Sequence, residues 1–215
     1  MKYPYASFRY IYPPRPSGAI HHDHVSRYPG WIAQYKYNGT RNIIFVFPDG
    51  HIELFNRHRE HNKAYHPTQE MINAFQSLKL KSGRFYVFDG ELMHSKTRGL
   101  KDRLILFDVL VFEGDYLIGS RYIDRYLILE KLLGKPTEFE QETGNQIAYR
   151  VNRNIWFSKI YTKDLQERFK KLIHMDEVEG LVLKDPNGTL TPGLQEENNG
   201  AWMIRVRKPH KNYAY

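Results

Sequence analysis

Lys36-Tyr37-Asn38-Gly39-Thr40-Arg41 is the stretch of sequence on which the interpretation of the whole chain depends. An apolar segment, residues 43–47, follows it almost at once, so the sequence predicts a turn that leads into a strand. Gly39 allows such a turn to come close to a bound molecule, because glycine has no Cβ atom. We expect the turn to present Lys36 and Arg41, where the lysine can act as a nucleophile. Taken alone, a lysine and an arginine beside a turn are more often simply solvated.

The composition is that of a folded, basic protein without disulfides. Of the 215 residues, 41% are hydrophobic, which is enough to bury a core, and the length predicts one domain. The chain has no cysteine, which excludes disulfides and Cys-rich zinc or iron–sulfur sites. Lys and Arg total 32 against 24 for Asp and Glu, giving a net charge of +8. This excess favours a polyanionic partner such as nucleic acid, although charge also serves solubility.

The hydrophobic pattern predicts an α+β fold of mainly antiparallel sheets flanked by helices. Residues 43–47 and 51–55 are β-rich runs separated by Pro48, Asp49 and Gly50, which is a hairpin signal. Apolar residues at helical spacing predict helices over residues 68–78, 122–133 and 163–175. Further strands are expected at residues 84–88, 104–112, 155–160, 180–184 and 202–206.

The first thirty residues are rich in Tyr, Pro, His and Arg and show neither helical nor strand periodicity. We expect an irregular basic and aromatic leader over residues 1–30, followed by the main domain over residues 31–215. Such a leader can stack on bases and hold phosphates. An extended arm packed over the domain surface would have the same composition, and packing is the more frequent case.

Five further segments follow the hexapeptide in order. Together with it they resemble the motifs of the covalent nucleotidyltransferases, namely ATP-dependent DNA and RNA ligases and mRNA capping enzymes. The resemblance extends from about Gln34 to Lys208, and an ordered set over that much of the chain is far more specific than any single motif. The segments are Asn56-Arg57, Asp89-Gly90-Glu91-Leu92, residues 104–110, residues 179–184 and residues 202–208.

The resemblance implies an ATP-grasp-like nucleotidyltransferase domain over residues 31–215, in which Lys36 takes AMP from ATP. AMP then passes to a nucleic-acid 5′-phosphate, and a 3′-hydroxyl displaces it to seal the strand. By resemblance, Phe107 stacks on the nucleobase. The expected catalytic residues are Lys36, Lys184, Arg205 and Arg207. The expected nucleotide-binding residues are Gln34, Tyr35, Lys36, Arg41, Arg57, Glu91, Phe107, Lys184, Arg205 and Arg207.

The residue types suit this chemistry. A free lysine ammonium has a reference pKa near 10.4 and must lose a proton before it can attack phosphorus, which desolvation and neighbouring cations favour. Lys184, Arg41 and Arg207 are the candidate cations, and the same charges would hold triphosphate oxygens. Glu91 and Glu179, which we expect at strand ends, are hard oxygen ligands suited to Mg²⁺ or Mn²⁺, with a ribose contact as an alternative for Glu91. Surface salt bridges are the non-functional alternative for both.

Four positions depart from the family pattern. Asn38 stands in place of the usual aspartate. Gln34 stands where DNA ligases commonly have a glutamate that accepts a hydrogen bond from the adenine amino group. Because an amide can also donate, Gln34 leaves guanine open as the base. Arg205 and Arg207 replace the usual lysines, which keeps the charge and adds bidentate phosphate contacts.

Only seven residues follow Lys208, too few for the OB-fold domain that usually follows in ligases and capping enzymes. We therefore expect the catalytic domain alone, with an OB-fold or other protein supplied as a partner, removed by truncation or not needed. No apolar run is long enough to span a bilayer, and the first residues do not resemble a signal peptide. The sequence thus predicts no membrane association and an intracellular, cytoplasmic protein, with the nucleus and a viral context left open.

Two alternatives remain on the same fold. A GTP-dependent mRNA capping guanylyltransferase is kept open by Gln34, and a non-catalytic nucleic-acid-binding module by Asn38 and the arginine pair. We prefer an ATP-dependent polynucleotide ligase acting on nicked or 5′-phosphorylated DNA or RNA. A decayed enzyme would have little reason to retain all of its charged site residues. The choice between DNA and RNA stays open, since the contacts to a 2′-hydroxyl lie in loops.

Overall fold

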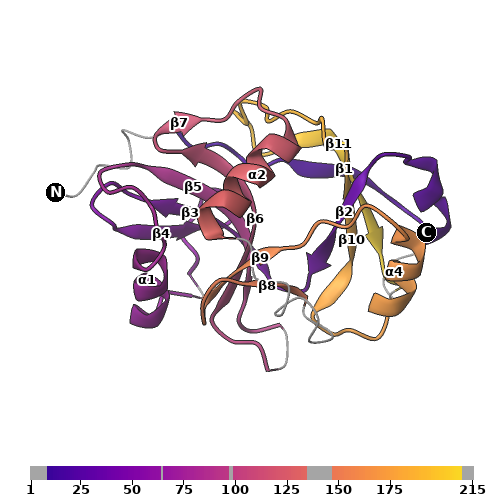
Figure 1. Cartoon of the computed structure of the whole chain (residues 1–215), viewed down its shortest axis with the longest axis horizontal. Coiled ribbons are helices and arrows are strands. Elements are labelled where there is room, and N and C mark those ends of the chain that lie inside the picture. The colour runs from indigo at the N-terminus through magenta and orange to yellow at the C-terminus, as the bar shows by residue number, and fades with distance from the viewer. Residues whose placement is uncertain (1–8, 64, 97–98, 135–146, 210–215) are drawn as a thin grey trace.

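The computed structural model describes residues 9–63, 65–96, 99–134 and 147–209. Two sheets dominate this part of the chain (Figure 1). A four-stranded sheet has the strand order β1-β11-β10-β2, and a seven-stranded sheet has the order β4-β3-β5-β6-β9-β8 with β7 paired to β6. Within the described residues only the β1–β11 and β6–β9 pairs are parallel. The mainly antiparallel α+β architecture expected from the sequence is therefore confirmed.

The four-stranded sheet combines the two ends of the described chain. Its strands are β1 (Arg15–Ile20), β2 (Ile32–Tyr37), β10 (Val178–Lys184) and β11 (Asn199–Arg207). The seven-stranded sheet takes its strands from the middle: β3 (Thr40–Val46), β4 (Ile52–Phe55), β5 (Tyr86–Met93), β6 (Arg103–Phe112), β7 (Asp115–Tyr116), β8 (Ala148–Arg150) and β9 (Ile155–Ser158).

Short helices cover the sheets. The α-helices are α1 (Gln69–Gln76), α2 (Tyr122–Leu133) and α4 (Leu165–Leu172), and a 3-10 helix, η2, spans His22–Arg27. Helix α1 begins where Thr68 accepts a hydrogen bond from the backbone N–H of Met71, an N-cap that satisfies a free donor. Helix α2 packs against β6, and α4 packs against η2 and β10 (Figure 1).

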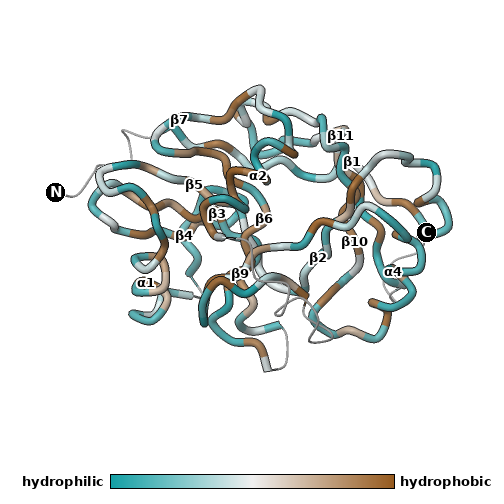
Figure 2. The backbone as a smooth tube through the Cα atoms, viewed as in Figure 1, coloured by the Kyte–Doolittle hydropathy of each residue, from teal (hydrophilic) through white to brown (hydrophobic). Residues whose placement is uncertain are grey.

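The core has an apolar cluster on each face of the seven-stranded sheet. Successive side chains of a strand point to opposite faces, and β3 is apolar on both, with Ile44 packed in the cluster beneath α1 and α2 and Phe45 packed on the other side with Tyr10 and Ile11. Phe45 is fully buried, and such burial contributes about 1.5–3 kcal/mol. The hydrophobic colouring of Figure 2 runs mainly along these inner strands. A third cluster joins the four-stranded sheet to α4.

The predicted leader is the clearest disagreement with the sequence. Residues 1–8 lie outside the described residues, but residues 15–20 form strand β1 and residues 22–27 form η2 instead of irregular structure. Strand β1 pairs with β11, about 185 residues later in the chain, so no local periodicity could reveal it. Pro16 is tolerated because β1 is an edge strand, where a missing backbone donor costs little.

Three motif residues also lie differently from expectation. Lys36 lies on strand β2 and Arg41 on strand β3, and neither lies on the turn between them, which consists of Asn38 and Gly39. Glu91 lies inside strand β5, paired to Arg41 of β3 and Ile105 of β6, and not at a strand end. Regular strand structure fixes these side chains more firmly than a turn would.

In the described part of the chain, no helix is long and apolar enough to cross a membrane.

Candidate active site

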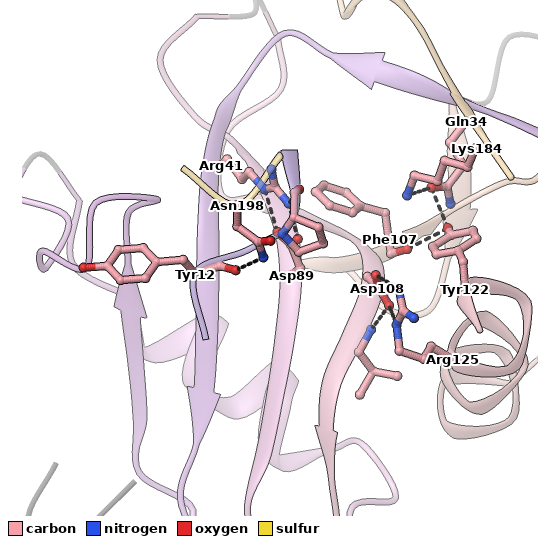
Figure 3. Close-up of polar contacts among 12 residues, drawn as sticks. Tyr12, Gln34, Arg41, Asp89, Phe107, Asp108, Tyr122, Arg125, Lys184 and Asn198 are labelled. Carbon is pink, nitrogen blue, oxygen red and sulfur yellow. Dashed lines mark hydrogen bonds and ion pairs between the residues drawn. The ribbon is translucent and has the colours of Figure 1, made fainter. Parts of the chain in front are cut away.

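A cavity of about 490 Å³ lies where the two sheets meet. This size is in the range typical of small-molecule sites. Side chains from both sheets face it, together with the segment before β1 and the loop after β4 (Figure 3). Every residue predicted for the site lines this cavity: Gln34, Tyr35, Lys36, Arg41, Arg57, Glu91, Phe107, Glu179, Lys184, Arg205 and Arg207.

Lys36 is held by a carboxylate on the neighbouring strand. Strands β2 and β10 are antiparallel, with Lys36 opposite Gly180, so Glu179 projects beside the lysine. The Lys36 amine donates a hydrogen bond to Glu179 Oε2 and forms an ion pair with it. Both side chains are partly exposed, at 23% and 37%. The amine is therefore oriented by the protein and still accessible to a ligand.

Arg41 forms a second ion pair deeper in the cavity. Its guanidinium binds both carboxylate oxygens of Asp89, and a further N–H donates to the Pro14 carbonyl at 2.9 Å (Figure 3). Asp89 is 1% exposed, and burial raises its pKa while Arg41 lowers it. Removing one partner of such a pair leaves a buried charge without compensation. Most of the Arg41 donor capacity is thus engaged within the protein.

Gln34 and Lys184 lie on the four-stranded sheet and contact Tyr122 of helix α2, which packs against β6 of the seven-stranded sheet. Gln34 Oε1 accepts hydrogen bonds from Lys184 Nζ and from the Tyr122 hydroxyl, each at 2.7 Å (Figure 3). Burial lowers the pKa of Lys184 to about 7 against the pull of Asp108 and Asp89, because the ammonium form loses its hydration. Burial raises the pKa of Tyr122, so its hydroxyl stays protonated and donates.

Phe107 presents an aromatic ring at the centre of the cavity. The Arg41 guanidinium carbon lies 5.5 Å from the ring centroid and Lys184 Nζ lies 5.3 Å from it. Cations at such distances are attracted to the negative ring face. The backbone carbonyl of Phe107 accepts a hydrogen bond from Tyr122 at 3.0 Å, which fixes the strand at this point. A flat, apolar group bordered by cations can receive a nucleobase with its phosphates near the charges.

Two carboxylates in the cavity could hold a divalent cation. Burial raises the pKa of Glu91 to about 7, although Lys36, Arg41 and Lys96 lower it. Glu91 and Glu179 face the same cavity, and Glu91 together with the Glu179 oxygen that does not bind Lys36 could hold a hard cation such as Mg²⁺. The residues present therefore fit the metal expected from the sequence.

Tyr35 contributes differently from its neighbours. On β2 the side chains of Gln34 and Lys36 share the cavity face, so Tyr35 points to the opposite one. Its ring packs against Tyr161, with centroids 5.0 Å apart, and its hydroxyl lies 3.5 Å from Arg168. A contact between Tyr35 and a ligand would therefore use its backbone.

Three arginines complete the basic border of the cavity. Arg57 lies after β4, as expected, and its Nε donates to His58 at 3.0 Å. Arg205 and Arg207 lie on β11, on the same side of the strand, and Arg205 Nε donates to the Gly18 carbonyl at 3.3 Å. These side chains place positive charge along one rim.

Sequence reasoning missed the buried pair that supports this site. Arg125 of α2 is 0% exposed and binds Asp108 through two bonds of 2.9 Å, while Asp108 also accepts the backbone N–H of Val109 (Figure 3). One signal was available. Arg125 falls on the apolar face of its helix with Tyr122 and Leu129, and a charge at a core position needs a partner. Lys96, from the loop after β5, was missed as well.

The sequence is similar to those of known DNA ligases. Residues 19–203 match the family described as "ATP dependent DNA ligase domain". A DNA ligase 2 of Korarchaeum cryptofilum is 25% identical over 189 residues, which is 78% of this chain and 30% of that protein. A DNA ligase of Cenarchaeum symbiosum is 23% identical over 205 residues, covering 85% of this chain and 31% of that protein. The chain thus spans about a third of the length of these curated relatives.

Solved structures share the fold. A mycobacterial DNA ligase D in complex with ATP aligns with a TM-score of 0.58 at 19% identity, over 89% of this chain and 59% of that one. The ATP-dependent DNA ligase of bacteriophage T7, also with ATP, aligns with a TM-score of 0.54 at 14% identity, over 91% and 68%. The fold is that of the nucleotidyltransferase domain of these ligases. Since the family match covers most of its length, the chain belongs to the ATP-dependent DNA ligase domain family.

Proposed function

We propose that this chain is the adenylation domain of an ATP-dependent DNA ligase and that Lys36 is its nucleophile. The observation that carries the proposal is the Lys36 amine, which is paired with Glu179 and open to a nucleotide-sized cavity lined by an aromatic ring and several cations. A lysine on an exposed turn would not be oriented in this way. Family membership supports the same reaction.

The cavity offers separate surfaces for the parts of ATP. Phe107 would stack on the adenine, while Gln34 and the backbone of Tyr35 border the base. Lys184 lies 5.3 Å from the Phe107 ring centroid, and Arg205 and Arg207 lie farther along the wall. Cations in a partly buried cavity bind phosphate oxygens more strongly than in water. A divalent cation held by Glu91 and Glu179 would neutralise phosphate charge and polarise the phosphoryl oxygens.

The first step forms a bond between Lys36 Nζ and the α-phosphorus of ATP. The amine must first lose its proton, and the hydrogen-bonded Glu179 oxygen lies where it can accept it. As the N–P bond forms, the bond between the α-phosphorus and the bridging oxygen breaks, and pyrophosphate leaves with that electron pair. The cations around the cavity stabilise the charge that builds up on the leaving group.

The adenylated lysine then reacts with nucleic acid. AMP passes from Lys36 to a DNA 5′-phosphate, which regenerates the amine, and a 3′-hydroxyl then displaces AMP to seal the strand. The net charge of +8 favours this polyanionic substrate. An OB-fold domain or another protein would complete the grip on a nicked duplex. An intracellular location, where ATP and DNA are both present, is part of this proposal.

Incubation with ATP and Mg²⁺, followed by intact-mass and peptide mapping, tests the proposal. We expect one AMP attached to Lys36, and no adduct in Lys36→Ala. Lys170→Ala is a matched control, because Lys170 is an exposed helical lysine outside the cavity and should leave labelling unchanged. An adduct on Lys36→Ala would disprove the nucleophile. Labelling by GTP but not by ATP would replace the ligase with a guanylyltransferase, and DNA binding without any adduct would indicate a non-catalytic module.

A further inference from the structure

Strand β1 places a basic side chain on the cavity wall that none of the recognised motifs contains. Arg15 is the first residue of β1, and its backbone N–H donates to the Asn198 carbonyl at 2.7 Å. Its Cα is in register with that of Asn199 on β11. The segment before it is anchored too, since the Tyr12 carbonyl accepts from Asn198 Nδ2 at 2.7 Å (Figure 3). The main chain therefore fixes the position of Arg15.

Arg15 differs in its bonding from the three cations at the centre of the expected site. Lys36 and Arg41 are in ion pairs, and Lys184 donates to Gln34. The Nε atom of Arg15 is buried and has no acceptor within the part of the chain that the structure describes. A buried donor without an acceptor is unfavourable, and an anionic ligand that accepts from it would remove this cost.

The charge balance of the cavity points to a phosphate-bearing ligand. Eight Lys or Arg residues line it against four Asp or Glu residues, so the lining carries an excess of positive charge. A guanidinium suits phosphate best of all side chains, because its planar set of donors matches two phosphate oxygens at once. Arg15 shares this cavity with Lys36, so the phosphates that come nearest are those of the bound nucleotide.

We propose that Arg15 binds the phosphates of ATP beyond the α-phosphate, so that the edge strand β1 forms part of the nucleotide site. The inference rests on the proposed function, since it assumes that the cavity takes ATP. It extends the site to a segment that precedes the nucleophile by about twenty residues. Arg15 would hold the triphosphate in the orientation that in-line attack by the lysine requires.

Equilibrium binding of two nucleotides isolates this role. The Lys36→Ala background prevents covalent chemistry, and the ligands are α,β-methylene-ATP and AMP, which share base and sugar. We expect Arg15→Ala to weaken binding of the ATP analogue about tenfold and to change AMP binding less than about twofold, as a lost bidentate phosphate contact predicts. Arg15→Lys should recover part of the loss. Arg27→Ala is the matched control, because Arg27 lies on exposed η2 outside the cavity and carries the same charge.

The possible outcomes separate the two proposals. Equal weakening of both ligands, or of neither, overturns the role of Arg15. Weaker binding to a nicked duplex with unchanged binding of the ATP analogue also overturns it, in favour of a nucleic-acid phosphate. If the analogue shows the Arg15 dependence but the unmutated protein never forms an adduct, the inference stands and the proposed ligase activity fails. Melting curves of each variant exclude misfolding as the cause.

Discussion

The two sheets bring opposite charges to the cavity between them. The four-stranded sheet supplies most of the cations, including Lys36, Lys184 and Arg207, whereas the seven-stranded sheet supplies the buried carboxylates Asp89 and Asp108. Two exceptions are paired within their own sheet, Glu179 with Lys36 and Arg41 with Asp89, and two further cations, Arg57 and Lys96, come from loops after β4 and β5. One sheet therefore carries the groups that handle phosphate. The seven-stranded sheet provides a buried polar layer that holds the ring of Phe107 and helix α2 in place.

The largest effect should follow from changing the reactive group of the four-stranded sheet while its charge is kept. Lys36→Arg can retain the ion pair with Glu179, but a guanidinium does not lose its proton in proteins. Adduct formation with labelled ATP should fall by at least about 10³-fold, as expected for loss of a nucleophile. Nucleotide binding should change little. Normal adduct yield in this variant would show that another residue reacts.

Breaking the buried ion pair between Asp108 and Arg125 should affect the stability of the fold instead of the reaction. Arg125→Met leaves Asp108 buried without its partner, which costs about 3–5 kcal/mol of unfolding free energy. Urea unfolding measures the loss. Arg121→Ala at the start of the same helix is the matched control, since its ion pair with Asp124 is exposed and screened by solvent and should contribute little. Similar losses for both variants would contradict the structural role given to the buried pair.

The buried contact between Lys184 and Gln34 can be tested through the pH dependence of stability. Lys184 has a pKa near 7 in the fold against a usual 10.5, so the unfolded chain binds more protons between these values and stability rises with pH. We expect a gain of about 2 kcal/mol between about pH 7 and pH 9. Gln34→Glu places a carboxylate beside the ammonium, raises the pKa of Lys184 and should flatten this rise, as should Lys184→Met. An unchanged slope in both variants would exclude Lys184 as its source.

The smallest effect should follow from replacing Phe107, whose ring the seven-stranded sheet presents to the cavity. Phe107→Leu keeps an apolar side chain but removes the flat face that Arg41 and Lys184 approach. Loss of a stacking contact of about 1 kcal/mol should raise the KM for ATP by about fivefold, with the rate at saturation nearly unchanged. Adduct formation at several ATP concentrations measures both. A fall in the saturated rate with an unchanged KM would remove Phe107 from the base site.

Local signals in the sequence were sufficient for much of the fold. The helix predicted over residues 122–133 has those bounds in the structure, because its apolar spacing and the glycine after it mark both ends. The β3–β4 hairpin also formed where turn residues separated two apolar runs. The order of the motifs was sufficient to select the side chains that line one cavity. Their individual roles stay predictions.

Long-range pairing accounts for what the sequence did not reveal. The Lys36–Glu179 and Asp108–Arg125 pairs depend on how strands and helix come together, and neither is encoded by spacing along the chain. Strand β1 was missed because its partner lies near the other end of the sequence. Arg15 consequently went unnoticed as a site residue.

The order of strands in the four-stranded sheet has a consequence for synthesis on the ribosome. Strands β1 and β2 lie within residues 15–37, but β10 and β11 lie within residues 178–207. The amine of Lys36 therefore has no neighbouring strand β10 until about 140 further residues have been translated. Contacts between such distant segments form slowly, because a long loop must close first. The nascent chain should gain the ability to bind nucleotide only after strand β11 has been translated.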